Sequence, residues 1–84
     1  MKRQEVLQAI NSEREYQDTK WGKVDDPNYV SYHQTQFLVD LEIHLNKAKQ
    51  AAYNVNWVEV MNEFRKIGAL AVKCGEVHNM PERK

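Results

Sequence analysis

The chain is poor in cysteine, proline and glycine, and it has no excess of charge of either sign. Its single cysteine, Cys74, excludes an internal disulfide, and a cysteine-based structural zinc site needs at least two thiolates. Twelve basic and twelve acidic residues cancel, which disfavours broad electrostatic contact with duplex nucleic acid or an anionic membrane. We therefore expect no nucleic-acid partner, no membrane partner and a cytoplasmic location.

Long apolar runs are also missing. The N-terminal stretch MKRQEVLQAI has no apolar segment of signal-peptide length, and no segment approaches the roughly 20 apolar residues that span a bilayer. With 42% hydrophobic residues the chain is nevertheless too apolar for disorder. Its 84 residues are enough for one domain with a small core. We expect a single domain over 1–84 that gains stability as a homo-oligomer.

The sequence does contain helical periodicity, in three stretches, and it has no alternating strand pattern. The spacing predicts helices over about 2–19, 31–53 and 57–78. Between the first two, the segment WGKVDDPNYVSY is rich in turn-forming residues and is expected to be a loop. We predict an all-α fold of three helices, in which the last two form a long antiparallel hairpin and the first packs across it.

Capping signals and apolar stripes support the last two helices. Ser31 with Gln34, and Asn56 with Glu59, have the spacing of capping boxes. Apolar residues recur at steps of three and four and predict one buried stripe on each helix. The predicted stripes are Leu38, Leu41, Leu45, Ala48 and Ala52, then Trp57, Met61, Phe64, Ile67, Ala71 and Cys74.

Polar residues form one row beside each of these stripes. Positions three and four apart lie on one helix face, so the two rows would border a common groove if the helices pack by their apolar stripes. The alternative is that both rows are solvated flanks with helix-stabilising ion pairs. The rows are Asp40, His44 and Lys47 on the second helix, and Glu59, Glu63 and Lys66 on the third.

The first helix places polar residues in line with apolar ones. Arg14 and Gln17 share a stripe with Ile10 and Trp21, although charged groups are rarely buried without a partner. One interpretation is structural, with Arg14 paired to Asp18 at the next turn. The other is functional, with Arg14 and Gln17 contacting a ligand.

Four aromatic residues have two interpretations as well. Their rings can stack on a nucleobase, which contributes on the order of 1–3 kcal/mol per base, or they can anchor a small core. The four are Trp21, Tyr29, Tyr32 and Trp57.

Other chemistries have little support in the sequence. None of His33, His44 and His78 has a partner at metal-ligand spacing. Cys74 lies in an apolar segment with no base beside it, as inert thiols do. The three glycines are isolated, so no phosphate-binding loop is present.

Three segments resemble the MazG-like family of all-α nucleoside triphosphate pyrophosphohydrolases, which bacteria and their phages encode. The segments are EREYQDTKWG, FLVDLEIHLNKAKQA and EVMNEFRKIGALAVKCGEVH. Together they extend over nearly the whole chain, and the first is the most specific. The resemblance implies a site in which Glu-x-x-Glu on one helix and Glu-x-x-Asp on the next hold magnesium against the nucleotide phosphates, so that water attack releases pyrophosphate.

The chain departs from that pattern at the metal-binding positions. In register with the family, the first pair falls on His44 and Lys47 and the second on Glu63 and Lys66. Three of the four implied carboxylates are thus replaced, and an ammonium group repels magnesium. We expect no cofactor. If the chain were active, Mg²⁺ would be the cofactor, Glu63 the catalytic residue, and Glu42 with Glu63 the metal ligands; a shifted register would also bring in Asp40.

The lysines can instead neutralise phosphate charge themselves. The leading prediction is therefore a catalytically silent MazG-like protein, of phage or bacterial type, that binds or sequesters a nucleotide or nucleotide-derived signal at an oligomer interface. Such a pseudoenzyme in a phage would act against host defence, in the host cytoplasm. The residues predicted to contact the ligand are Arg14, Gln17, Trp21, His44, Lys47, Glu63 and Lys66.

Two alternatives remain open. The first is an active magnesium-dependent pyrophosphohydrolase with a rearranged carboxylate set. The second is a protein-interaction module that docks on a host factor through the small residues Gly68, Ala71 and Gly75 of the third helix.

Overall fold

The computed structural model describes all 84 residues and contains three α-helices and no strand. The helices are α1 (Arg3–Trp21), α2 (Gln34–Tyr53) and α3 (Trp57–His78). The all-α prediction is confirmed, and the bounds of α3 are as expected. No helix is both long enough and apolar enough to cross a membrane.

The start of α2 differs from the prediction. The capping residue is His33, whose side chain accepts a hydrogen bond from the Thr35 backbone N–H, with Gln36 as the reciprocal partner. The box predicted from Ser31 and Gln34 is therefore wrong. The physical reason is that the His33 side chain, two residues after Ser31, supplies the cap, so α2 begins at Gln34; just upstream the Tyr32 carbonyl accepts a hydrogen bond of 2.7 Å from His78 Nε2.

The start of α3 follows the prediction in part. The Asn56 side chain accepts a hydrogen bond from the Glu59 backbone N–H at 3.1 Å, which confirms the cap. The Glu59 carboxylate does not complete the box, since it accepts a hydrogen bond from Asn62 one turn further on.

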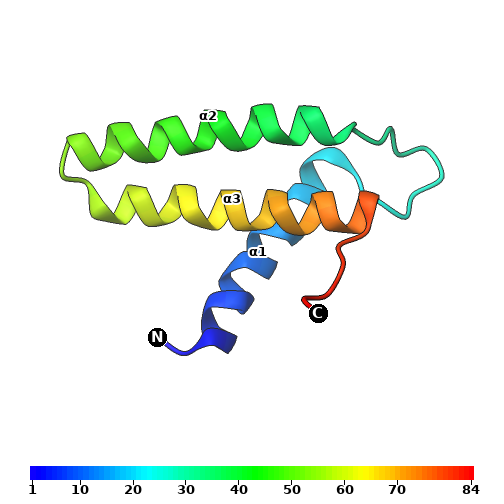
Figure 1. Ribbon diagram of the computed structural model, residues 1–84, viewed down its shortest axis with the longest axis horizontal. Coiled ribbons are helices and arrows are strands. Elements are labelled where there is room, and N and C mark those ends of the chain that lie inside the picture. The colour runs from blue at the N-terminus through cyan, green and yellow to red at the C-terminus, as the bar shows by residue number, and fades with distance from the viewer.

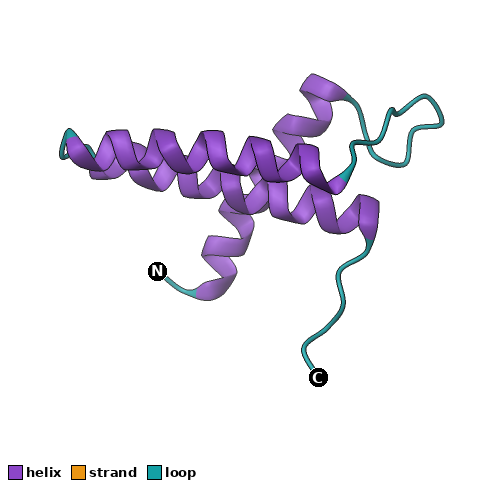
Figure 2. Cartoon of the chain, turned by 45° about the horizontal axis from the view of Figure 1, so that its top comes forward, coloured by secondary structure: helices purple, strands orange, loops and turns teal.

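Helices α2 and α3 lie side by side and run in opposite directions, joined by a short turn (Figure 1). α1 crosses α3 at a steep angle and packs on α3 rather than on α2 (Figure 2). α1 ends at Gly22, whose positive φ of 88° suits a residue without a Cβ. The loop 22–33 then connects α1 to α2 past the C-terminal part of α3 (Figure 1).

The buried line on α2 is shifted relative to the prediction. Its less exposed positions recur at steps of four and three: Phe37, Leu41, His44, Ala48 and Ala51. Two leucines of the predicted stripe, Leu38 and Leu45, are exposed. Successive side chains on a helix point about 100° apart. Leu38 and Leu45 each follow a residue of the buried line by one position, so they lie at the edge of the α2–α3 contact and not within it.

The matching line on α3 also differs from the predicted stripe. It contains Val60, Glu63, Ile67, Leu70, Cys74 and Val77. Trp57, Met61 and Phe64, which the prediction placed inside, are more than half exposed. The physical reason is that α3 has neighbours on two sides only, α2 and α1, and the side with Met61 and Phe64 has none. The apolar residues that are fully buried are Phe37, Ala48, Ala51 and Ala69.

Candidate ligand-binding site

A cavity of about 880 Å³ opens between the C-terminal half of α1, the loop 22–33 and the facing sides of α2 and α3. This volume lies within the range of small-molecule sites in proteins. All three helices and the loop contribute to its wall, so the cavity exists only in the folded chain. The residues that line the cavity include Gln17, Trp21, Tyr29, His44, Lys66 and Lys73.

Aromatic rings line one end of the cavity. Trp21, at the end of α1, and Tyr29, in the loop, both belong to its wall, as does Tyr32. Trp21 remains more than half exposed, so it is a surface of the cavity and not a core anchor. Trp57 lies at the start of α3, is exposed and does not line the cavity.

Two lysines contact these rings. Lys20 Nζ is 4.6 Å from the centroid of Trp21, and Lys73 Nζ is 5.8 Å from Trp21 and 5.4 Å from Tyr29. These are cation–π distances. Neither ammonium group has a carboxylate within 4.0 Å. The aromatic end of the cavity therefore has two lysines whose charge no ion pair neutralises.

Lys73 is the more unusual of the two, because only 6% of it is exposed. Burial lowers the pKa of Lys73, and the nearby positive charge of Arg14 lowers it further. Sequence reasoning missed this residue. One sequence feature could have indicated it: Lys73 is the only lysine inside the mostly apolar run IGALAVKCGEV, so a helix there places this lysine among packed residues.

Arg14 has a structural role in this geometry. Its guanidinium donates two hydrogen bonds of 2.9 Å to Glu76 on α3, and it forms an ion pair of 2.8 Å with Asp18. The hydrogen bond to Glu76 raises the pKa of Arg14 more than burial lowers it. The structural interpretation of Arg14 is confirmed in its pairing with Asp18. Arg14 does not line the cavity, and it binds an acid on α3 rather than one on α2.

Gln17 lies one turn after Arg14 and does line the cavity. It is 4% exposed, and its Oε1 atom is buried without a hydrogen-bond partner. A buried unpaired amide oxygen is costly. Gln17 is thus placed where a polar group of a ligand or a water would satisfy it.

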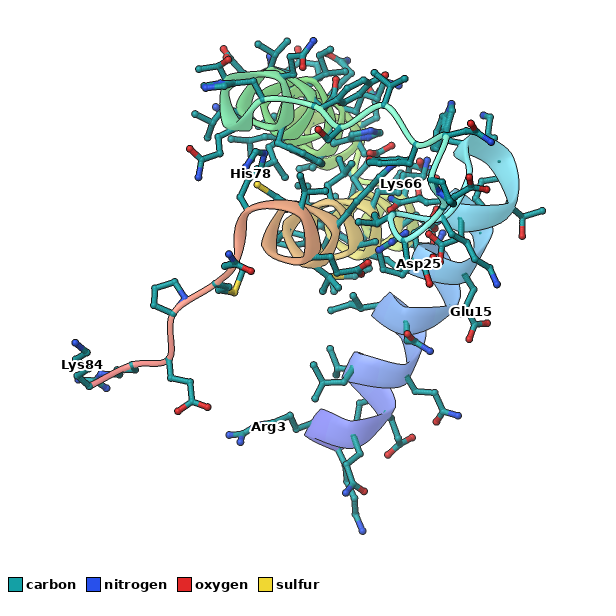
Figure 3. The ribbon with its side chains drawn as sticks, turned by 90° about the vertical axis from the view of Figure 1, so that its right-hand side faces the viewer. Arg3, Glu15, Asp25, Lys66, His78 and Lys84 are labelled. Carbon is teal, nitrogen blue, oxygen red and sulfur yellow. The ribbon has the colours of Figure 1, made fainter.

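The opposite end of the cavity contains a hydrogen-bonded pair across the α2–α3 contact. His44 Nδ1 lies 2.7 Å from Glu63 Oε2, and Lys66 Nζ lies 3.5 Å from the other carboxylate oxygen. Figure 3 shows Lys66 on the side of α3 where α1 and the loop lie. His44 and Lys66 line the cavity. The two predicted polar rows are therefore brought together at His44, Glu63 and Lys66.

Glu63 itself is almost completely enclosed, with 3% exposed. Burial would raise the pKa of Glu63, but the hydrogen bond from His44 and the charge of Lys66 outweigh burial, so the pKa is lowered. The carboxylate is thus charged and fully engaged within the protein.

Lys47 lies elsewhere. It lines a separate, shallower depression of about 300 Å³ near the α2–α3 turn, together with Gln50, Asn54, Glu59 and Glu63. The structure does not bring Lys47 and Lys66 into one pocket.

The residues present do not fit a magnesium site. No three His, Cys, Asp or Glu side chains converge in a way that could hold a metal ion. Both oxygens of Glu63 face protein partners, and Glu42 is exposed and lines neither cavity. Asp40 does line the main cavity, but without a second carboxylate from the expected set.

Comparisons with known protein families, with curated proteins and with solved structures give no match for this chain. The resemblance to MazG-like proteins therefore stays a prediction that rests on the three sequence segments.

Proposed function

We propose that this chain binds a phosphorylated, nucleotide-type ligand in the main cavity and binds it without a metal ion. The observation that carries the proposal is the wall of the cavity, where exposed aromatic rings lie beside lysines that have no carboxylate partner. A base can stack on Trp21 or Tyr29. Phosphate oxygens can then meet lysine ammonium groups, which are point-charge phosphate binders.

The two ends of the cavity suit the two ends of such a ligand. Trp21 and Tyr29 form the aromatic end, with Gln17 available for a hydrogen bond to the ligand. Lys66 lies at the other end, beside the His44–Glu63 pair. In this arrangement Lys20, which has no carboxylate within 4.0 Å, takes the charge-neutralising role that magnesium has in the family the sequence resembles, and Lys66 stays paired with Glu63.

The proposed protein is catalytically silent towards phosphoanhydrides. Metal-dependent water attack requires free carboxylates on the metal, whereas Glu63 is bonded to His44 and Lys66. The biological role that follows is sequestration of a nucleotide or nucleotide-derived signal. In a phage such a protein would counter a defence signal in the host cytoplasm.

We also propose that the chain works as a homo-oligomer, in which the antiparallel α2–α3 hairpin packs against a second copy. Only eight of the 84 residues are buried, and four of these are polar or charged. Large apolar side chains remain exposed on every helix, among them Leu7, Leu38, Met61 and Phe64. A chain of this size needs more apolar burial than this for independent stability.

The interaction-module alternative is less well supported. A Cβ atom added at Gly68 would lie 2.9 Å from Ile10 Cδ1, and one at Gly75 would lie 3.1 Å from Met80 Cε. The small residues of α3 thus already accommodate α1 and the C-terminal segment, and they do not present a free strip to a host factor.

Calorimetry with a panel of nucleotides and ADP-ribose, in the presence of EDTA, tests the proposal. Binding heat with at least one of them supports it. No heat with any of them at high protein concentration would leave the interaction module ahead, and pyrophosphate release that needs magnesium and is lost in Glu63→Ala would favour the active enzyme.

A further inference from the structure

Lys73 is placed differently from every other lysine of the chain. It is 94% buried on the side of α3 that lines the cavity, after Lys66 and Leu70, and its Nζ has no hydrogen bond and no ion pair. Lys73 Nζ is not among the side-chain atoms that are both fully enclosed and without a hydrogen-bond partner. The amine therefore keeps contact with the cavity while its aliphatic stem is enclosed.

Burial and the positive charge of Arg14 favour the neutral form of this amine. The acids Asp18, Glu76 and Asp40 act in the opposite direction, as do the cation–π contacts with Trp21 and Tyr29. Asp18 and Glu76 are bonded to the Arg14 guanidinium, and the net direction is a lowered pKa for Lys73. Desolvation beside a second cation is how proteins activate a lysine as a nucleophile.

We propose that Lys73 is a reactive amine, and that it captures a ligand bearing an aldehyde by forming an imine at Nζ. A ligand class that combines the proposed nucleotide part with an aldehyde is a nucleotide-linked sugar whose anomeric carbon is free, because its open-chain form presents an aldehyde. This inference rests on the proposed function, since the rings and the other lysines would hold the nucleotide part. Lys66 is not a competitor for the reaction, because its ammonium lies 3.5 Å from the Glu63 carboxylate.

The step needs no co-reactant. The neutral Nζ attacks the carbonyl carbon, and a proton moves from nitrogen to the former carbonyl oxygen to give a carbinolamine. The carbon–oxygen bond then breaks, the oxygen leaves as water with both protons from nitrogen, and a carbon–nitrogen double bond remains. No electrons are gained or lost overall, and hydrolysis reverses the capture, so the outcome is reversible sequestration.

Reductive trapping tests the proposal in the intact chain. The protein is incubated with periodate-oxidised ATP, a nucleotide dialdehyde, together with cyanoborohydride, and the modified lysines are mapped by peptide mass spectrometry. We expect Lys73 to be modified several times faster than the exposed Lys2, Lys49 and Lys84, none of which lines the cavity. Label spread over the exposed lysines, with Lys73 unmodified or no faster than they are, would overturn the proposal.

Two variants and a competitor separate reactivity from binding. Lys73→Arg should lose the fast phase of labelling, whereas the matched control Lys49→Arg, on the exposed face of α2, should keep it. Excess unmodified ATP should slow the labelling of Lys73. If ATP binds in calorimetry but Lys73 is not preferentially trapped, the imine proposal fails while the proposed function stands. If Lys73 is preferentially trapped by propanal and ATP gives no heat, the reactive amine stands and the nucleotide proposal fails.

Discussion

Lys73 and Glu63 are both ionisable and almost fully buried, but only Glu63 has side-chain partners that bind its charged group. Glu63 has two partners, His44 and Lys66, that satisfy its charge. Lys73 has aromatic rings and no counter-ion. A buried group that is satisfied contributes to the fold, whereas a buried cation without a partner is a cost that a bound anion can offset. We therefore assign Glu63 a role in stabilising the fold and Lys73 a role in the candidate site.

The Glu63 pair gives a stability prediction. His44→Ala should lower the free energy of unfolding by about 1–3 kcal/mol near neutral pH, since a buried carboxylate loses a short hydrogen bond. Urea unfolding followed by circular dichroism measures this, with Gln50→Ala on the exposed side of α2 as a control. Equal stability of His44→Ala and the parent chain would contradict the account.

The same pair predicts the direction of an acid effect. The pKa of Glu63 is lowered in the folded chain from its ordinary value of 4.5. Its contribution to stability is therefore complete above about pH 4.5 and is lost as the pH falls through the lower folded-state pKa. Unfolding free energies measured across this acid range should fall less steeply in His44→Ala. An unchanged slope would show that the His44 hydrogen bond does not depress the pKa of Glu63.

Lys73 gives a pH prediction for the capture step. The neutral amine is the nucleophile, so the rate at which an aldehyde labels Lys73 should rise as the pH rises through the pKa of Lys73, which lies below its ordinary 10.5. Trapping with propanal and cyanoborohydride from about pH 7 to about pH 10, followed by peptide mass spectrometry, measures the effect. The pH profile of Lys73 should be displaced to lower pH relative to that of a lysine in a short unstructured peptide. Parallel pH profiles for the two lysines would exclude Lys73 as an activated amine.

At the scale of elements, the docking of α1 on α3 defines the cavity wall. Arg14 bonds to Glu76, and Arg65 donates a hydrogen bond to Glu13 at 2.9 Å. Both contacts join α1 to α3 and tie the α1 segment that carries Gln17 and Trp21 to its neighbour.

Breaking the first contact should therefore loosen α1. Glu76→Ala leaves the buried guanidinium of Arg14 with Asp18 as its only carboxylate partner, and we expect a loss of about 1–3 kcal/mol in unfolding free energy. Glu82→Ala, in the exposed C-terminal segment, is the control. Hydrogen exchange should show faster opening of α1 in Glu76→Ala than in Glu82→Ala, and equal protection would count against this role of Arg14.

The elements themselves were largely predictable from local signals. The bounds of α3 follow from its Asn56 cap and its apolar periodicity, both of which are properties of a few neighbouring residues. The start of α2 was not predictable in this way, because Ser31 and His33 both have side chains that can cap a helix and the structure uses His33. The segment just before it also has a non-local contact, between Tyr32 and His78, 46 residues apart in sequence.

The site was predictable only in part, for the same reason. The meeting of His44 with Glu63 follows from two polar rows on adjacent helices. Lys73 and Gln17 acquire their significance from the position of α1 and the loop 22–33 around α3, which no local pattern encodes. Lys47 illustrates the opposite case. The register with the family that the sequence resembles placed it in the same groove as Lys66, whereas the structure places it in a separate depression.

On the scale of the whole molecule, the exposed apolar side chains exceed the buried ones in number and size. Phe37 is the only large side chain that is fully enclosed. A single chain therefore buries little apolar surface to stabilise its three helices, and contact with a second copy would bury more.

The exposed apolar side chains predict that the chain forms an oligomer which a charge on α3 disrupts. Phe64 is 51% exposed, so Phe64→Glu places no charge in the interior of one chain but should disrupt an interface that covers this side of α3. Light scattering coupled to size-exclusion chromatography should give a dimer or larger species for the parent chain and Lys49→Glu, and a smaller species for Phe64→Glu. A monomeric parent chain would refute the proposed oligomer.

Metal-independent binding of a nucleotide-type ligand is the central claim, and one titration tests it most directly. ATP and ADP-ribose are titrated into the protein in EDTA, and again in excess magnesium with pyrophosphate release recorded. We predict saturable binding heat in EDTA for the ligand that binds, with no requirement for magnesium, and no release of pyrophosphate when magnesium is present. Binding that appears only with magnesium, or pyrophosphate release that disappears in Glu63→Ala, would contradict it.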